Sequence, residues 1–379
     1  MKKTMKPSLN KFLALVLAFV LIFPLGAYAQ SITTPGKSAA LMEVTSGRLL
    51  FGKNEHEKLP MASTTKIMTC ILALEMGRQD EIVTVSKNAA GVEGSSMYLA
   101  HGEKLPLIEL LYGLMLSSGN DAAVAIAEHI AGDVQSFAEL MNRKAAVLGA
   151  KNTHFVTPNG LHDDAHYTTA YDLALISCYA MKNETFRKIV KTQSHHIPAG
   201  EQNREHWLKN KNRILSEYDG GCGIKTGFTK KAGRCLSAAA ERNGMQLVAV
   251  VLHDGDMFGS CKMLLDYGFQ NYSMQTLVRK GESFGNISIE NGLADEVSIA
   301  AAESIILPLT EEEGNIIKRK LYAAEYLTAP VKKAFPAGQI EFFLNGELLA
   351  KTALITENEV LENTFLYHFF QIIRKHIAA

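Results

Sequence analysis

The stretch from residue 60 to residue 77 constrains the fold of this chain more than any other. A short polar run ending at Lys66 opens a segment whose apolar residues recur at helical spacing as far as Gly77, which is typical of a buried helix with a glycine stop. On such a helix Ser63 and Lys66 lie on one face, about one turn apart. A partly buried lysine can lose its charge and take the proton of a neighbouring serine. The helix N-terminus also favours an anion forming beside Ser63.

Ser-x-x-Lys alone is not specific, because a capping serine followed by a solvated lysine fits the same letters. A second polar cluster, Ser118-Gly119-Asn120, falls between a helix predicted over residues 105–116 and another over 122–130, with a third helix over 136–148. It is therefore predicted to be a tight loop that can aim polar side chains into a cleft. An ordinary helix stop and cap would use the same residue types.

A third cluster, Lys225-Thr226-Gly227, lies on a predicted strand that starts at Gly220. A turn at 229–231 and strands at 236–240 and 246–252 are predicted to follow. Residues 38–53 are predicted to form a hairpin around a turn at 45–47. Together these segments predict an antiparallel sheet. The cluster would present a cation and a hydroxyl, with a glycine leaving room for a substrate backbone. The alternative is a lysine on a strand edge beside a turn.

The three clusters together are far more specific than any one of them. Ser-x-x-Lys, Ser-Asp-Asn and Lys-Thr-Gly, in this order, are the signature set of class A β-lactamases and penicillin-binding proteins. The chain resembles the low-molecular-mass penicillin-binding proteins of the serine D-alanyl-D-alanine carboxypeptidase type. The variant Ser-Gly-Asn points to these carboxypeptidases and away from the β-lactamases. The resemblance covers essentially the whole mature chain, and stretches 58–69, 117–123, 157–161, 168–174 and 223–229 carry it.

The resemblance implies a role for each motif residue. Ser63 would be the acylated nucleophile, Lys66 its general base, and Ser118 the relay of a proton to the leaving D-alanine. Asn120 would hold the substrate amide, Lys225 and Thr226 would bind the terminal carboxylate, and Gly227 would be a further substrate-binding residue. The oxyanion hole would be the backbone N–H groups of Ser63 and Phe228. Since Lys66 and Lys225 are two cations near one serine, each should lower the pKa of the other, and a neutral Lys66 is predicted.

The resemblance also implies the fold class: an α/β (α+β) serine β-lactamase/transpeptidase-like domain with an antiparallel sheet flanked by helices, followed by a small all-β domain and a C-terminal amphipathic helix. We expect a signal peptide at 1–29, the penicillin-binding domain at 30–275, the β domain at 276–363 and the helix at 364–379. In the β domain short alternating segments occur at 283–289, 297–301, 322–327 and 339–344, and Asn345-Gly346 predicts a hairpin.

The first 29 residues have the pattern of an export signal. They contain a basic head, an apolar run over 12–23 and an Ala-x-Ala site at 27–29, and the run is too short for a comfortable membrane span. Removing them subtracts four of the 39 basic residues and none of the 39 acidic ones, which leaves 35 against 39. Without a basic patch, nucleic acid is not an expected partner. The mature chain is expected outside the cytoplasm.

The last stretch, residues 364–377, is a predicted amphipathic helix with four aromatic residues among six. It is too short to span a bilayer but suits the headgroup boundary. Related enzymes end in a similar anchoring helix, so we expect peripheral attachment to the outer face of the cytoplasmic membrane. The alternative is a terminal helix docked on the β domain.

Neither a disulfide framework nor a metal site is predicted. The five cysteines have no Cys-x-x-Cys spacing, and although Cys222 and Cys235 flank a hairpin, they are interpreted as small core residues. His162 and His166 imitate a metal pair, but they lie in a loop without a third ligand at helical spacing. We expect no metal and no organic cofactor.

The resulting hypothesis is a penicillin-binding cell-wall hydrolase that removes the terminal D-alanine from peptidoglycan stem pentapeptides. Penicillin would trap its acyl-enzyme. A β-lactamase would need a dedicated deacylating glutamate, and none can be assigned. A catalytically silent wall-binding protein would be free to lose Ser63 or Lys66. The sequence leaves the diamino acid of the stem peptide and the oligomeric state open.

Overall fold

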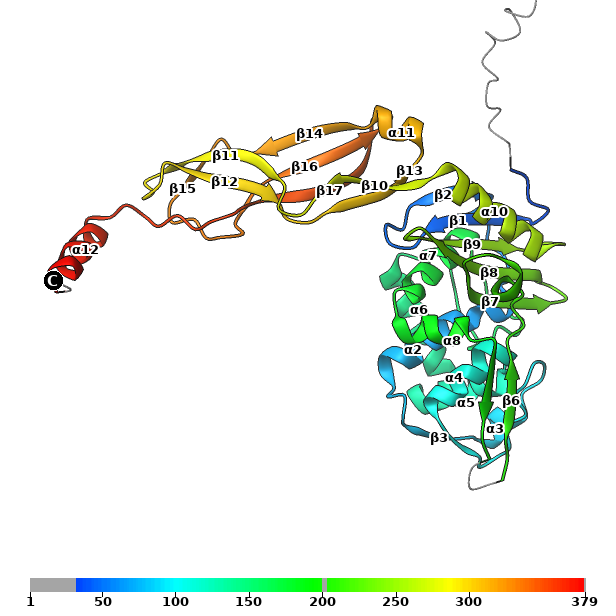
Figure 1. The fold of residues 1–379 in the computed structure, drawn as a ribbon. Helices are drawn as coiled ribbons and strands as arrows, with labels where there is room; N and C mark the ends of the chain where they lie inside the picture. The colour runs from blue at the N-terminus through cyan, green and yellow to red at the C-terminus, as the bar shows by residue number, and fades with distance from the viewer. Residues whose placement is uncertain (1–31, 200–202, 378–379) are drawn as a thin grey trace, which may run out of the picture. The chain divides into compact units, whose positions relative to one another are not determined.

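The computed structural model describes residues 32–199 and 203–377 of the 379-residue chain (Figure 1). The predicted signal peptide at 1–29 lies outside the described residues.

Five antiparallel strands form a sheet in the order β2-β1-β9-β8-β7. Their bounds are β1 (Ser38–Glu43), β2 (Leu49–Lys53), β7 (Gly221–Thr229), β8 (Gly233–Arg242) and β9 (Met245–Leu252). The predicted hairpin over 38–53 and the three strands predicted between residues 220 and 252 are confirmed. The strand that carries Lys225, β7, stands at one edge of the sheet.

Helices cover both faces of this sheet (Figure 1). On one face α10 (Met257–Asn271) packs so closely that a Cβ on Gly268 would lie 2.4 Å from a methyl carbon of Leu247. The alternate side chains Met42 and Val248 enter the large core on the other face, which α2 (Lys66–Met76) and α7 (Ala170–Met181) share. Both faces of these strands are therefore buried, as the period of two between side chains allows.

The remaining helices of this region differ from the predicted ranges at their ends. Their bounds are α4 (Leu107–Tyr112), the π-helix η2 (Gly113–Ser117), α5 (Asn120–Ala131), α6 (Val134–Leu148) and α8 (Glu184–Lys191). The helix predicted from residue 105 starts later, because Lys104–Pro106 form β4 and Pro106 is the N-cap. The helix predicted from residue 136 starts earlier, because the Asp133 side chain caps it by accepting from the Ser136 N–H.

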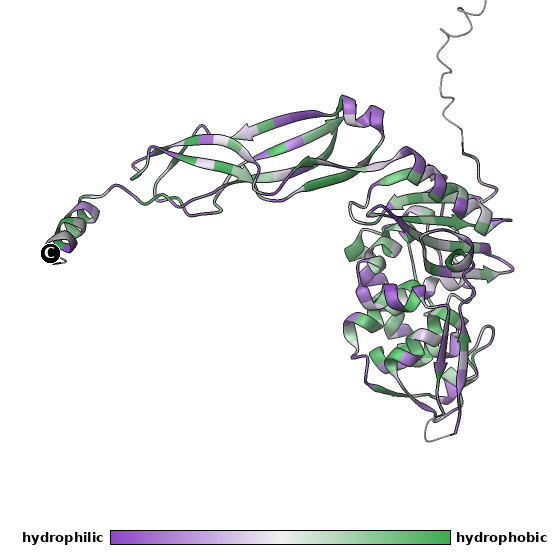
Figure 2. Ribbon diagram, in the orientation of Figure 1, coloured by the Kyte–Doolittle hydropathy of each residue, from purple (hydrophilic) through white to green (hydrophobic). Residues whose placement is uncertain are grey.

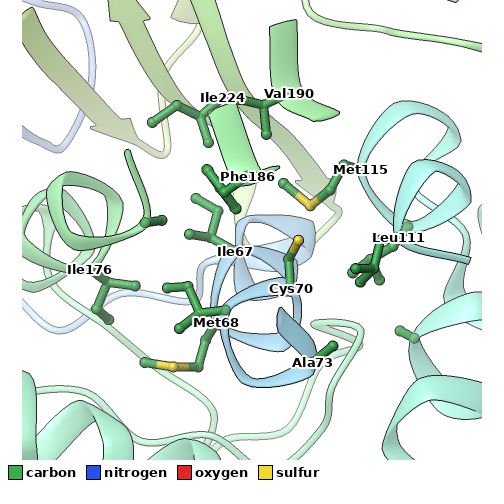
Figure 3. Packing of buried hydrophobic residues seen from close by; sticks show 14 of the residues in the cluster. Ile67, Met68, Cys70, Ala73, Leu111, Met115, Ile176, Phe186, Val190 and Ile224 are labelled. Carbon is green, nitrogen blue, oxygen red and sulfur yellow. The ribbon is translucent and has the colours of Figure 1, made fainter. Parts of the chain in front are cut away.

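The predicted buried helix of the nucleophile region, α2, is confirmed, and it lies at the centre of the main core (Figure 3). Its Ile67, Cys70 and Ala73 are buried among side chains from the surrounding elements, including Leu111, Met115, Ile176, Phe186, Val190 and Ile224. Gly77 ends the helix as expected. Its φ lies outside the left-handed region, so close packing rather than a left-handed turn favours glycine there: a Cβ would lie 2.5 Å from a methyl carbon of Leu107.

The C-terminal region forms two sheets. β10 (Ser273–Val278) pairs with β13 (Ile305–Leu309), and six strands follow the order β14-β16-β17-β12-β11-β15. Their bounds are β11 (Ser283–Glu290), β12 (Glu296–Ala301), β14 (Lys318–Ala323), β15 (Tyr326–Thr328), β16 (Pro336–Leu344) and β17 (Glu347–Thr356), with one short helix, α11 (Glu311–Ile316). The Asn345-Gly346 hairpin between β16 and β17 is confirmed. The prediction of one strand over 322–327 is wrong, because this range contains the end of β14 and the start of β15. These two strands lie at opposite edges of the sheet, although the alternation of side chains continues from one to the other.

Shorter elements complete the fold. They are β3 (Ile82–Thr84), which pairs with β4, the hairpin of β5 (Ser194–Ile197) and β6 (His206–Lys209), and the helices α3 (Lys87–Ala90), α9 (Ile214–Glu217) and α12 (Phe365–Ile377). Hydrophobic residues are interspersed with hydrophilic ones along α12 (Figure 2). Of the helices in the described parts of the chain, none is both long and apolar enough to cross a membrane.

Candidate active site

Ser63 lies on a single tight turn immediately before α2. This turn, η1 (Ala62–Thr65), is a 3₁₀-helix, whereas the sequence predicted an α-helical position for Ser63. With three residues per turn, residues i and i+3 stand directly above one another. Lys66, the first residue of α2, therefore brings its Nζ to 2.9 Å from Ser63 Oγ. Ala62 has a φ of 49°, a strained value for a residue with a side chain, next to the predicted nucleophile.

The Lys66 amine is fully buried and has three oxygen neighbours. Besides Ser63 Oγ, they are Asn120 Oδ1 at 2.7 Å and the Asn159 carbonyl at 2.6 Å. The last two oxygens can only accept hydrogen bonds. A neutral amine has two N–H groups for them and keeps its lone pair for the Ser63 hydroxyl.

Burial decides the charge of both lysines of the site. Desolvation lowers the pKa of Lys66 well below its usual value, and the charge of Lys225 lowers it further. Burial, with the nearby charge of Lys211, lowers the pKa of Lys225 to about 7. The sequence predicted that each of the two lysines lowers the pKa of the other, and only the effect of Lys225 on Lys66 is found. A Lys66 amine that is already neutral exerts no charge effect on Lys225.

The Ser118-Gly119-Asn120 motif spans the end of η2 and the start of α5. Ser118 ends η2 with a φ of 63° and is buried. Asn120, predicted to lie on the loop, is the first residue of α5. Its Nδ2 donates to the Glu93 carbonyl at 2.6 Å, which leaves the second N–H of the amide for a substrate carbonyl.

Asp121, which follows the motif, organises the wall of the site, and sequence reasoning did not single it out. Its buried carboxylate accepts from the backbone N–H groups of Met97 and Leu99 and from the Ser96 hydroxyl, at 2.6 to 3.2 Å. The adjacent Asn120 N–H donates to the Ser95 carbonyl at 2.7 Å. The loop over residues 93–99 is therefore attached to the start of α5.

The Lys225-Thr226-Gly227 motif lies on β7, as predicted, but its glycine has another role. A Cβ on Gly227 would lie 3.0 Å from the Met61 carbonyl and 3.0 Å from the Ser63 nitrogen. The missing side chain thus makes room for η1 of this chain, whereas the sequence argument assigned that room to the substrate backbone. Phe228, whose N–H is predicted for the oxyanion hole, follows with its ring 65% exposed.

The turn at residues 158–160 contacts both η1 and α2. In the sequence it was noted only as one of the stretches that carry the family resemblance. Asn159 supplies the carbonyl that Lys66 binds, and the Pro158 carbonyl accepts from the Thr69 hydroxyl at 2.6 Å. Gly160 has a φ of 83°, and a Cβ there would lie 2.0 Å from the Ala62 carbonyl. The Pro-Asn-Gly sequence is a turn signal that could have marked this contact.

His166 is also a neighbour of the site. Its buried ring accepts from the Val156 N–H through Nδ1, so Nε2 carries the proton and donates to Thr65 Oγ1 at 2.8 Å. The Thr65 hydroxyl in turn donates to the Ala62 carbonyl. Burial lowers the pKa of His166 to about 4, which keeps the ring neutral. His162, the other half of the apparent metal pair, instead lies 3.2 Å from Asp164.

All five cysteines are free and buried. Cys235 stands opposite Gly227 in the β7–β8 ladder, and the residue opposite Ala240 is Gly221, so Cys222 and Cys235 do not face each other. Their interpretation as core residues is confirmed.

Known proteins share this sequence and fold. The sequence profile described as D-alanyl-D-alanine carboxypeptidase matches residues 27–256, and the profile of the penicillin-binding protein 5 C-terminal domain matches residues 272–362. D-alanyl-D-alanine carboxypeptidase DacF of Bacillus subtilis is 32% identical over 90% of this chain and 90% of its own length. The enzyme DacC of Escherichia coli is 34% identical over 96% and 94%.

A solved structure of penicillin-binding protein 5 from Haemophilus influenzae shares the fold. It matches with a TM-score of 0.76 at 28% identity, over 87% of this chain and 99% of that one. The fold class and the family predicted from the motifs are confirmed. The chain belongs to the D-alanyl-D-alanine carboxypeptidase family of low-molecular-mass penicillin-binding proteins.

Proposed function

We propose that this chain removes the terminal D-alanine from peptidoglycan stem pentapeptides through an acyl-enzyme on Ser63. Family membership makes it a serine-type carboxypeptidase of the cell wall, which acts on D-Ala-D-Ala termini outside the cytoplasm and binds β-lactams. The assignment of individual residues rests on the geometry of the site.

One observation carries the assignment of nucleophile and base. The Lys66 amine has two oxygens that can only accept and one hydroxyl, 2.9 Å away, that can donate. This set matches the two N–H groups and the lone pair of a neutral amine. Within the described residues, no carboxylate takes part in these contacts.

The proposed reaction combines this pair with the roles that the family resemblance implies for the other motif residues. Lys66 takes the Ser63 proton, and Oγ attacks the carbonyl carbon of the penultimate D-alanine. The Ser63 and Phe228 N–H groups hold the resulting oxyanion. When the C–N bond breaks, the proton passes through Ser118 to the leaving amine. Water then hydrolyses the ester.

The substrate is held at both ends of the scissile bond. Asn120 donates its second amide N–H to the carbonyl on the acyl side, while Lys225 and Thr226 bind the terminal carboxylate. Gly227 keeps β7 against η1, which places strand and nucleophile together.

Mass spectrometry of the purified chain after incubation with penicillin tests this assignment. The expected result is one stable adduct on Ser63 and none on a Ser63→Ala variant. A folded protein without an adduct would contradict the mechanism. Rapid release of the penicillin would instead favour a β-lactamase, for which a deacylating carboxylate beside Ser63 is needed.

We also propose the division into a signal peptide at 1–29, a catalytic domain at 30–275, a β domain at 276–363 and a membrane-binding helix at 364–379. The division at 275 falls within β10, which pairs with β13. The exposed apolar side chains of α12, which include Phe365, Phe369 and Phe370, support attachment to the membrane surface.

A further inference from the structure

Hydrogen bonds attach the loop over residues 93–99 directly to Asn120 of the proposed substrate site. Glu93 accepts from Asn120 Nδ2 through its carbonyl, and Ser95 accepts from the Asn120 N–H. Gly94 approaches the same amide so closely that a Cβ on it would lie 2.7 Å from Asn120 Nδ2. Asn120 is itself bonded to Lys66, which contacts Ser63. Three hydrogen-bond steps therefore connect Ser63 with Glu93.

The chemistry of the substrate identifies what lies beside this loop. Ser63 attacks the carbonyl of the fourth residue of the stem peptide, so the amide on the acyl side contains the carbonyl of the third residue. Under the proposed function, on which this inference rests, Asn120 binds that carbonyl with one N–H. The other N–H of the same amide binds Glu93. One side-chain amide thus separates the third residue of the substrate from Glu93.

Glu93 has an unused charge. Its side chain is exposed, and across the described residues its carboxylate has neither a hydrogen-bond nor an ion-pair partner. Two other acidic groups near this loop are engaged: Asp121 binds the loop backbone, and Glu103 contacts His206 at 2.6 Å and Arg204 at 3.3 Å. Of these three acids in the described part of the chain, Glu93 is the one whose carboxylate is available to attract a cation on the substrate.

The same loop displays an aromatic ring at an energetic cost. Tyr98 has a φ of 64°, although it is not glycine, and its side chain is 79% exposed. Its neighbours Met97 and Leu99 are held by Asp121, and its carbonyl accepts from Arg204 at 2.6 Å. Such strain persists only where the surroundings impose it, and it gathers at ligand sites. Because the Tyr98 side chain is exposed, its burial within the chain does not offset the cost of this strained backbone conformation.

We propose that Glu93 and Tyr98 form the subsite for the third side chain of the stem peptide and select one that ends in an amine. A diamino acid has an aliphatic stem and a terminal ammonium. The ring of Tyr98 can contact the stem and attract the cation through its face. The Glu93 carboxylate pairs with the ammonium.

Two synthetic pentapeptides that differ only at the third residue test this subsite on the full mature chain. One contains lysine and the other Nε-acetyl-lysine, which keeps the stem but removes the charge. We expect kcat/KM to be about two- to five-fold higher for the lysine peptide, as for an exposed ion pair. This ratio should fall towards one in Glu93→Gln and as salt is raised.

Glu359→Gln, which changes an exposed glutamate of the β region, is the matched control and should keep the ratio of the unmodified enzyme. Tyr98→Ala should lower kcat/KM for the lysine peptide about two- to five-fold, whereas Tyr98→Phe should retain it. A ratio near one in the unmodified enzyme, or an unchanged ratio in Glu93→Gln, would overturn the subsite. Failure of the proposed function would look different, because neither peptide would be cleaved and penicillin would not acylate Ser63.

Discussion

At the scale of single residues, the site depends on two lysines that the fold has almost completely removed from water. Lys66 is 0% exposed and Lys225 is 2% exposed. Burying an ammonium is costly, so both groups release their protons more readily in the folded chain than in the unfolded one. The unfolded chain holds the Lys225 proton up to about pH 10.5 and the folded chain up to about pH 7. Raising the pH across that interval therefore stabilises the fold.

The pH profile of catalysis should reflect the titration of Lys225. Under the proposed mechanism a charged Lys225 binds the substrate carboxylate, so kcat/KM should fall as the pH rises through about 7, approaching tenfold per pH unit. Lys225→Arg should lower the maximum but shift the falling limb to higher pH, because a guanidinium stays charged. Rates on a pentapeptide over about pH 6 to about pH 10 measure both limbs. An identical falling limb in the two enzymes would rule out Lys225 as its cause.

At the scale of elements, the position of Ser63 depends on backbone segments that approach η1 without intervening side chains. β7 reaches it at Gly227, and the 158–160 turn reaches it at Gly160. The hydrogen bonds from His166 through Thr65 to the Ala62 carbonyl add a third support. At Gly160 both the positive φ and the contact with the Ala62 carbonyl require glycine, whereas at Gly227 the requirement comes from the close backbone contact alone.

A pair of glycines separates the two requirements. Gly149 and Gly160 have nearly the same φ, 82° and 83°, but a Cβ on Gly149 meets nothing closer than 3.8 Å. Gly149→Ala should therefore cost only the backbone term, about 1 to 2 kcal/mol of unfolding free energy. Gly160→Ala should cost more and displace η1, which lowers the penicillin acylation rate at least about tenfold.

Urea unfolding and acylation kinetics on the two variants test this comparison. Equal destabilisation, with unchanged acylation in both, would mean that the 158–160 turn does not hold η1 in place.

At the scale of the whole molecule, the chain combines a catalytic region with a terminal helix that leaves its apolar residues exposed. Phe365 is 81% exposed and Phe370 is 59% exposed. Leaving such rings in water forfeits the free energy that burial would supply. A membrane surface offers that burial without requiring a span.

Binding to phospholipid vesicles measures how much α12 contributes to membrane attachment. Removing residues 364–379 should lower the fraction of protein that sediments with phospholipid vesicles by about tenfold or more. Cleavage of a soluble pentapeptide should be unaffected. Phe370→Asp should weaken vesicle binding, whereas Leu348→Asp, which changes an exposed apolar residue of β17, should not. Equal sedimentation of the full and shortened chains would contradict membrane attachment through α12.

Local sequence patterns were sufficient to predict many of the secondary-structure elements of this molecule. The hairpin over 38–53, the buried helix that ends at Gly77 and the β16–β17 turn were predictable, because turn residues and apolar periodicity act over a few positions. The alternation over 322–327 failed as a guide, since a period of two does not show that the chain has moved to another strand. The three motifs identified the family because each combines residue types with a spacing that chemistry requires.

The sequence by itself determined which side chains are proposed to carry the chemistry and in what order they occur, since short motifs encode residue types and local turns. Only the tertiary structure decided what surrounds them. The carbonyl of Asn159, the carboxylate of Asp121 and the ring of His166 reach the site through contacts between segments far apart in the chain. The low pKa of Lys66 likewise comes from burial by the whole domain, which no local pattern specifies.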